Sequence, residues 1–399
     1  MKALLKSVLM CGLLTTTFVY FTSCNNDDDN PGPKLTGNSK TYILAPVSNP
    51  AISGTVTFAE RDDRQVLITI QLTGTQSGST HPAHIHSNSA AEGGGIVLDL
   101  TSVNGADGKS ETVVKALNDG TPLTYNDLLS FDGYVNVHLS QADLGTLIAQ
   151  GDIGQNELTG DNKVYTLTPV ADPAVTGTAT FAKRQNGSTL VTVALTGTQP
   201  GTYPSHIHEN TVAETGSIVI NLNDVDGTTG MARTNVDTLN DGTAITYDQL
   251  LDFNGYLNVH TGNTFVVQGD IGQNELTGDK KEYALNEVGG SGVSGIATFA
   301  KRKNNKTQIT LSLQGTTAGG DHPAHIHSNN AATGGGIVLD LNNVDGATGK
   351  SVTSANALNS GTAITYDELI VYNGYINVHL SPTQLATIIA QGDIGSNAP

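Results

Sequence analysis

The sequence predicts an all-β protein of three tandem antiparallel domains, each a Greek-key β-sandwich or flattened barrel with one or two short helices. Three observations lead to this prediction. Only 14% of the 399 residues are charged, 46 are glycine and none is tryptophan, which is typical of a turn-rich β protein and excludes a disordered polyelectrolyte. Short apolar segments alternate with period two, the pattern of half-buried strands. A unit of about 120 residues recurs three times along the chain.

The first 24 residues have the pattern of an export signal. Lys2 and Lys6 form a basic start, an apolar stretch follows, and small residues precede Cys24. A transmembrane anchor is the competing interpretation, but the apolar stretch is short for one. The segment resembles a bacterial lipoprotein signal, and this resemblance implies that Cys24 is lipidated after cleavage.

Residues 25–34 contain three consecutive aspartates and then Pro31-Gly32-Pro33, which predicts a flexible, acidic tether. An acidic run directly after a lipidated cysteine resembles a surface-export signal of bacterial lipoproteins. We therefore expect the chain to be anchored in the outer membrane through Cys24 and exposed on the cell surface. A lipoprotein that faces the periplasm is the alternative.

Charge and cysteine content exclude two classes of protein. The formal net charge is −18, and removal of Lys2 and Lys6 with the signal leaves 17 basic against 37 acidic residues. Nothing in this composition offers a basic surface for phosphates, which excludes nucleic-acid binding. Cys11 lies inside the signal, so Cys24 has no disulfide partner in the mature chain, and the fold must depend on core packing.

The three copies follow one another almost without a gap. Each opens on Leu-Thr-Gly, at 35–37, 158–160 and 276–278, and each closes on Gln-Gly-Asp-Ile-Gly, at 150–154, 268–272 and 391–395. We therefore divide the chain into domains at 35–156, 157–274 and 275–399. A unit of this length is large enough to hold its own hydrophobic core.

Short period-two runs predict seven or eight strands in each copy, separated by Gly, Asn-Gly and Asp-Gly turns. In the first copy the runs include 55–58, 66–72, 84–86, 96–100, 134–139 and 147–153. Capping-box spacing predicts a short helix after Thr124, and again after Thr246 and Thr365. A second helical turn is expected at 141–148 and at the matching place of the third copy.

All 11 histidines lie at two places of the repeat. One place holds a His-x-His pair, and a single histidine follows 52 residues after the second member of the pair in every copy. The three groups are His84, His86 and His138; His206, His208 and His260; and His325, His327 and His379. His81 and His322 precede the first and third pairs, whereas Tyr203 takes that place in the second copy.

Strand geometry predicts that each group converges. Residues i and i+2 of a strand share a face, so His84 and His86 point the same way, and His138 joins them if its strand is the neighbour. Neutral imidazoles bind zinc or copper, and three of them leave a coordination position open. His81 and His322 are candidates for a fourth ligand, which the second copy lacks, so the second copy is expected to be the least active site.

Two other interpretations of the histidines remain open. A His-x-His pair on a strand can form hydrogen bonds across loops and serve only the structure. Clustered histidines can also act as a switch that responds to pH.

The segments Pro82-Ala83-His84-Ile85-His86 and 133–138 (GYVNVH) resemble the CHRD domain, which is named from chordin and also occurs in bacterial proteins. The second copy matches through 204–208 and 256–260, and the third through 323–327 and 375–379. The resemblance implies an immunoglobulin-like β-barrel, distantly similar to copper–zinc superoxide dismutases. It implies no settled biochemical activity.

We therefore expect a non-catalytic, surface-anchored binding protein with a His-rich site in each domain, whose ligand is copper or zinc, a glycan or a surface protein. A copper-dependent redox enzyme of superoxide-dismutase type is the first alternative. The acidic charge and the lack of further histidines for a zinc loop count against it. A purely structural envelope or adhesion protein is the second alternative.

Overall fold

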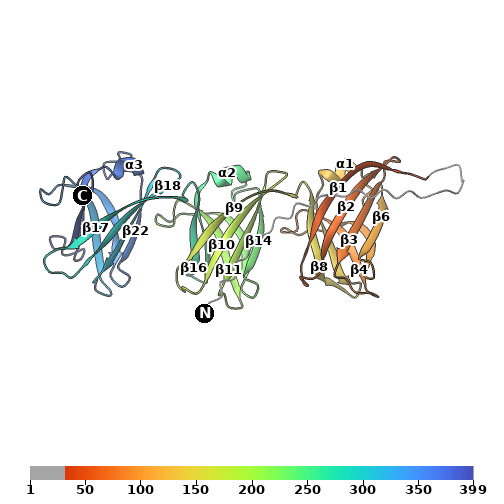
Figure 1. Cartoon of the computed structure of the whole chain (residues 1–399), viewed down its shortest axis with the longest axis horizontal. Coiled ribbons are helices and arrows are strands. Elements are labelled where there is room, and N and C mark those ends of the chain that lie inside the picture. The colour runs from red at the N-terminus through yellow and green to blue at the C-terminus, as the bar shows by residue number, and fades with distance from the viewer. Residues whose placement is uncertain (1–31, 399) are drawn as a thin grey trace, which may run out of the picture.

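The computed structural model describes residues 32–398, which form three β-barrels arranged in a row (Figure 1). The expectations for the signal, for Cys24 and for most of the tether lie outside the described residues. No helix in the described part of the chain has the length and apolar character needed to cross a membrane.

The first barrel has eight antiparallel strands. They are β1 (Leu35–Pro46), β2 (Ser53–Arg61), β3 (Val66–Thr73), β4 (Thr80–Ser87), β5 (Ile96–Asn104), β6 (Lys109–Val114), β7 (Asp132–Ser140) and β8 (Asp143–Gly154). Their order around the barrel is β1-β2-β3-β6-β5-β4-β7-β8. The chain therefore crosses over twice, from β3 to β4 and from β6 to β7, which makes β4 and β7 neighbours.

The all-β prediction is confirmed. Of the two forms that the sequence allowed, a sandwich of two sheets or a barrel, the structure shows a closed barrel. Closure comes from pairing between the first and last strands, at Ala45 with Gln150 and at Pro46 with Ala149. A closed sheet leaves no edge strand with unpaired backbone groups. The same closure occurs in the other two barrels.

The second and third barrels repeat this order. The second consists of β9 (Leu158–Pro169), β10 (Thr176–Arg184), β11 (Thr189–Thr196), β12 (Thr202–Glu209), β13 (Ile218–Asp226), β14 (Met231–Val236), β15 (Asn254–Thr261) and β16 (Thr264–Gly272). The third consists of β17 (Leu276–Glu287), β18 (Ser294–Arg302), β19 (Thr307–Gln314), β20 (Asp321–Ser328), β21 (Ile337–Asp345), β22 (Lys350–Ala355), β23 (Asn373–His379) and β24 (Ile388–Gly395).

Each barrel carries one short helix, in agreement with the capping-box prediction. The helices are α1 (Tyr125–Leu129), α2 (Tyr247–Leu251) and α3 (Tyr366–Leu369). Thr124, Thr246 and Thr365 cap them, and each accepts a hydrogen bond from the backbone three residues later. The second helical turn predicted at 141–148 is wrong, because the chain there turns tightly and enters β8. The matching segment of the third barrel forms turns before β24.

Every barrel encloses its own hydrophobic core. Inward-facing valine, isoleucine and leucine side chains surround one fully buried phenylalanine in each, Phe58, Phe181 or Phe299. Alternation along the strands produces this arrangement, because every second side chain points inward. The outward side chains of β4 and β7 and of their counterparts are then free to form a site on the barrel wall.

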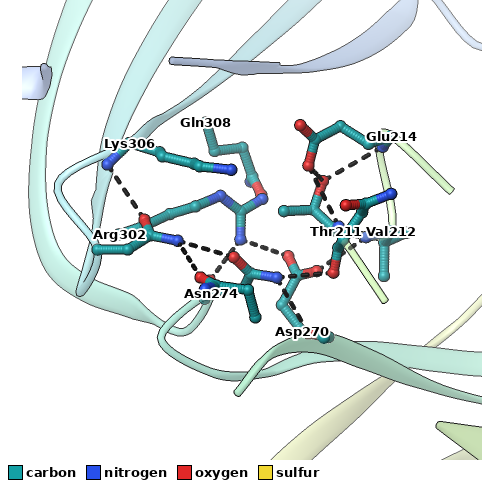
Figure 2. A network of polar contacts seen from close by, with 12 residues as sticks. Thr211, Val212, Glu214, Asp270, Asn274, Arg302, Lys306 and Gln308 are labelled. Carbon is teal, nitrogen blue, oxygen red and sulfur yellow. Dashed lines mark hydrogen bonds and ion pairs between the residues drawn. The ribbon is translucent and has the colours of Figure 1, made fainter. Parts of the chain in front are cut away.

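Neighbouring barrels are joined by a buried arginine. Arg302, at the end of β18, donates from Nη1 to Asp270 of the second barrel over 2.6 Å and to the backbone carbonyl of Asn274, and from Nη2 to Gln308 over 2.7 Å (Figure 2). Asp270 in turn accepts a hydrogen bond from the backbone of Val212 over 2.8 Å. The carboxylate therefore connects a loop of its own barrel to the next barrel.

The first junction uses the matching residues. Arg184 of the second barrel is fully buried and donates to Asp152 over 2.7 Å and to the carbonyl of Asn156. The corresponding residue of the first barrel, Arg61, pairs instead with Asp63 in the same turn. The buried arginines were not identified from the sequence.

Candidate metal centre

The predicted neighbourhood of the two histidine-bearing strands is confirmed. β4 pairs with β7, with His84 opposite Asn136 and His86 opposite Tyr134. Ile85, between the two histidines, is fully buried in the core. The histidines therefore lie on the outer wall of the barrel, where Gly94 of the loop after β4 and Leu144 at the start of β8 contact them.

The three rings of the first barrel meet. Nδ1 of His84 lies 3.1 Å from Nε2 of His138, and the ring centroids of His84 and His86 are 6.0 Å apart. One nitrogen from each of the three rings lies within 4.8 Å of the other two. Around a tetrahedral zinc ion at about 2.0 Å, ligand nitrogens are about 3.3 Å apart. Small side-chain movements would thus bring all three onto one ion.

Backbone carbonyls orient two of these rings. Nδ1 of His86 lies 3.0 Å from the carbonyl oxygen of Gly94, and Nδ1 of His138 lies 2.7 Å from that of Leu144. A carbonyl only accepts hydrogen bonds, so each Nδ1 carries the proton and each Nε2 keeps its lone pair. Histidines that ligate metals are commonly held in this way through their second nitrogen.

A carboxylate and an amide complete the surroundings. Nε2 of His84 lies 3.8 Å from Oδ1 of Asp99, on the neighbouring strand β5. The Asn136 amide nitrogen lies 3.4 Å from Nε2 of His86, and Gln150 fixes that amide by donating to its oxygen over 2.9 Å. Asp99 was missed from the sequence, although it recurs as Asp340 in the third copy.

The third barrel repeats the group with His325, His327 and His379, which meet the same 4.8 Å limit. Nε2 of His325 lies 3.7 Å from Asp340. Three buried ring nitrogens have no hydrogen-bond partner, namely Nδ1 of His325 and both nitrogens of His379. Buried polar atoms without partners are unfavourable, and a bound cation would satisfy one nitrogen of each of these two rings. The donor set therefore fits a transition-metal ion.

The second barrel brings only two of its three predicted ligands together. Nε2 of His260 lies 3.3 Å from Nδ1 of His206, and their rings stack at an angle of 19°. The ring of His208 does not complete the group. Among the residues that the structure describes, the 4.8 Å criterion met by the three rings of the first and third barrels is not met by His206, His208 and His260. A tight turn between β15 and β16 holds His260, whose Nδ1 bonds to the carbonyl of Gly262 over 2.8 Å.

The structure does not bring His81 and His322 into the groups. Nδ1 of His81 lies 2.8 Å from the carbonyl of Leu139, and its Nε2 lies 2.8 Å from the Ser79 hydroxyl. Both nitrogens are thus used within the fold. Nδ1 of His322 lies 2.9 Å from the carbonyl of Leu380 in the same manner. His81 and His322 precede the first histidine of the pair by three residues, an odd number, so their side chains point to the opposite face of the strand. The strand pairing is also irregular directly after each of them.

Electrostatics favour the neutral form of four rings in the groups of the first and third barrels. Burial lowers the pKa of His84, and the adjacent His138 lowers it further. Burial also lowers the pKa of His138, of His325 and of His379. Since only the neutral ring offers a lone pair, these rings are ready to bind a cation near pH 7.

Comparison with known proteins agrees with the repeat. A family model described as "CHRD domain" matches residues 34–147 and 155–265, more than half of the chain. Comparisons with the curated proteins and with the solved structures gave no significant match. The matched ranges include the histidine groups of the first two barrels. The chain therefore belongs to the CHRD domain family.

Proposed function

We propose that the protein is a lipid-anchored, surface-exposed binding protein that holds transition-metal ions on its barrel walls and catalyses no reaction. The convergence of three imidazole nitrogens within 4.8 Å, in two separate barrels, is the observation that carries this proposal. Two sites per chain are expected, one at His84, His86 and His138 and one at His325, His327 and His379.

The donor set favours copper or zinc. Three neutral imidazoles suit these ions, whereas calcium and magnesium prefer oxygen ligands. Three protein ligands leave at least one coordination position for water or for a group from outside. An imidazole or carboxylate of a surface protein, or the hydroxyls of a glycan, would have the chemistry to take that position.

A copper-dependent redox enzyme of superoxide-dismutase type is the second candidate, because an open position beside three histidines would also suit it. The crossovers in the strand order are compatible with the expected Greek-key, dismutase-like topology. The surroundings favour binding over this activity. Asp99 and Asp340 lie beside the histidines and would repel an anionic substrate, and the chain as a whole is strongly acidic.

The array supports multivalent binding. Lipidation at Cys24 and a tether over 25–34 would hold the barrels close to the membrane. Two equivalent sites on one chain convert the second binding event into an intramolecular one, which raises the avidity for a partner with repeated groups. Without a second ligand on the same partner, each site would act as an independent metal carrier.

Metal stoichiometry tests the proposal. The untagged protein is incubated with copper or zinc, desalted and analysed for metal by mass spectrometry, with two ions per chain expected. The double variant His84→Gln and His325→Gln should hold none, whereas His206→Gln, which changes the incomplete group, should keep both. Absence of binding in a micromolar titration would refute the proposal, and rapid superoxide removal by the copper-loaded protein would favour the enzyme.

A further inference from the structure

A groove of about 620 Å³ lies between the first and second barrels, which are neighbours in the row (Figure 1). One wall comes from β1 and β8 of the first barrel and includes Ile43 and Asp152. The other comes from β10, β11 and β14 of the second barrel, where Thr180 pairs with Thr192, and Thr192 with Arg233. Small-molecule sites typically measure about 300–1,000 Å³, so the groove is large enough for a ligand that contacts both barrels.

Arg233 brings an uncompensated positive charge to this groove. Residues 157–274 contain four basic side chains, and the other three, Lys163, Lys183 and Arg184, each have a carboxylate partner within 2.7 Å. Among the described residues, no carboxylate lies within ion-pair distance of the Arg233 guanidinium, and the side chain is exposed. A guanidinium of this kind can bind a carboxylate through two parallel hydrogen bonds.

The two acidic residues that line the groove are already neutralised. Asp152 accepts a hydrogen bond from Arg184 over 2.7 Å. Glu157 pairs with Lys40, also over 2.7 Å. The net negative charge of the whole chain is screened beyond about 8 Å at physiological ionic strength, whereas Arg233 would touch the ligand. The groove therefore favours an anion.

Apolar side chains from both barrels surround the rest of the groove. Ile43 is 76% exposed and Leu158 is 42% exposed, although both are large hydrophobic residues. Leu190 of the second barrel is half-buried beside them. Apolar side chains that gather in a concave place are typical of ligand sites, and an apolar ligand would remove them from water.

The equivalent groove between the second and third barrels lacks both features. It is smaller, at about 450 Å³, and keeps Asp270 and Glu275 in the places of Asp152 and Glu157. Three lining positions differ in charge or polarity, with Thr166, Gln308 and Val352 in place of Ile43, Leu190 and Arg233. The free guanidinium and the apolar wall are therefore properties of the first groove and are not required to join two barrels.

We propose that the groove between the first and second barrels binds an apolar carboxylic acid, such as a medium-chain fatty acid. The carboxylate accepts hydrogen bonds from the Arg233 guanidinium, and the apolar chain lies against Ile43, Leu158 and Leu190. A sugar would leave these apolar side chains without a suitable partner, and a metal cation would be repelled by the guanidinium.

The site is separate from the histidine groups, because no histidine is among the described residues that line the groove. The inference therefore does not rest on the proposed function. Titrations are carried out on the metal-free chain, so that failure of one proposal is distinguishable from failure of the other.

Octanoate, octanol and acetate test the two parts of the ligand separately. Octanol lacks the carboxylate, and acetate lacks the apolar chain. Each is titrated into the full chain near neutral pH by isothermal titration calorimetry. We expect octanoate to bind with a dissociation constant of about 1 mM or below, and the other two to bind at least about tenfold more weakly. Absence of octanoate binding, or equal binding of octanoate and either of the other probes, would overturn the proposal.

A pair of charge variants assigns the carboxylate contact. Arg233→Gln should weaken octanoate binding at least about tenfold, because an amide carries no charge. Lys183→Gln is the matched control, since it removes the same charge from the same barrel, but Lys183 pairs with Asp248 and does not line the groove. It should leave octanoate binding unaltered. An equal loss in both variants would reveal a general effect of charge and refute the assignment.

Ile43→Thr tests the contact with the first barrel. The change introduces the residue that the second groove has at this position, and it should weaken octanoate binding by about three- to tenfold through loss of apolar contact. Ile43 is mostly exposed, so the variant should fold like the parent. Unchanged octanoate affinity would contradict the placement of the ligand between the two barrels.

Discussion

The guanidinium of Arg302, in the third barrel, donates to the carboxylate of Asp270, in the second barrel, over 2.6 Å, and the arginine side chain is fully buried. Asp270 itself is only 15% exposed. Removal of one member of a buried pair leaves the other charge without compensation, which costs more than the pair contributes when intact. We therefore expect a large loss of stability when only one of the two residues, Arg302 or Asp270, is replaced.

Arg302→Leu should destabilise the junction between the second and third barrels by about 3 kcal/mol. Urea denaturation would measure the loss, and small-angle X-ray scattering would detect increased motion between the barrels. Arg61→Leu is the control, because Arg61 pairs with Asp63 inside a surface turn, and its midpoint should not change measurably. An equal response of the two variants would show that the junction does not depend on the buried pair.

The carboxylates beside His84 and His325 should strengthen metal binding through these rings. Replacement of the residues that orient metal ligands typically lowers affinity by about 10- to 100-fold. Asp99→Asn together with Asp340→Asn should show a loss in this range in a competition titration with a chromophoric chelator. Glu111→Gln, whose partner is Lys109 on the surface, changes the charge but should leave the affinity alone. If Glu111→Gln weakens binding as much, a general charge effect would explain the result instead.

The metal-free protein should lose stability as the pH falls below about 6.5. Burial and neighbouring histidines lower the pKa of His84, His138, His325 and His379 from the ordinary value of 6.5. Below this value the unfolded chain takes up protons that the folded chain does not, so the free energy of unfolding decreases with decreasing pH. Above about pH 7 these groups contribute no pH dependence.

Thermal unfolding between pH 8 and pH 5 would measure this effect. The double variant His84→Gln and His325→Gln should show a shallower decrease in Tm than the parent, because fewer buried rings take up protons. Identical slopes for parent and variant would argue that other groups, such as carboxylates, cause the dependence.

Cys24→Ser should release the protein from the membrane fraction. Lipidation requires a thiol, and a serine hydroxyl does not replace it. Fractionation and labelling with a radioactive fatty acid would follow the change. Cys11→Ser, inside the expected signal, should leave both the label and the membrane fraction unaltered. Membrane retention of the Cys24 variant would contradict the proposed anchor.

The strands and the histidine groups were predictable because both depend on local periodicity. Alternation placed Ile85 inside and His84 outside, and the constant spacing to His138 indicated a fixed neighbour strand. Closure of the barrel was not predictable in this way. It depends on pairing between Ala45 and Gln150, which are distant in the sequence, and no spacing in the sequence relates the two.

Other features were missed because their meaning depends on three-dimensional context. Arg184 and Arg302 recur at one position of the repeat, as does Arg61, yet only the first two are buried against a preceding barrel. His81 has the residue type of a ligand, but both of its nitrogens are already bound within the fold. Composition and spacing do not distinguish these cases.

Ile85 lies in the core, whereas His84 and His86 lie on the opposite face, so the proposed metal ligands are not part of the packing that stabilises the barrel. In a zinc finger the ion holds the fold together, and its removal unfolds the chain. Here the wall is closed by backbone hydrogen bonds and the apolar core lies on the face opposite the histidines, so we expect the barrel to stay folded without an ion. On the proposed function, loading and release would then follow the concentration of metal around the protein, and the barrel would keep the geometry of the empty site.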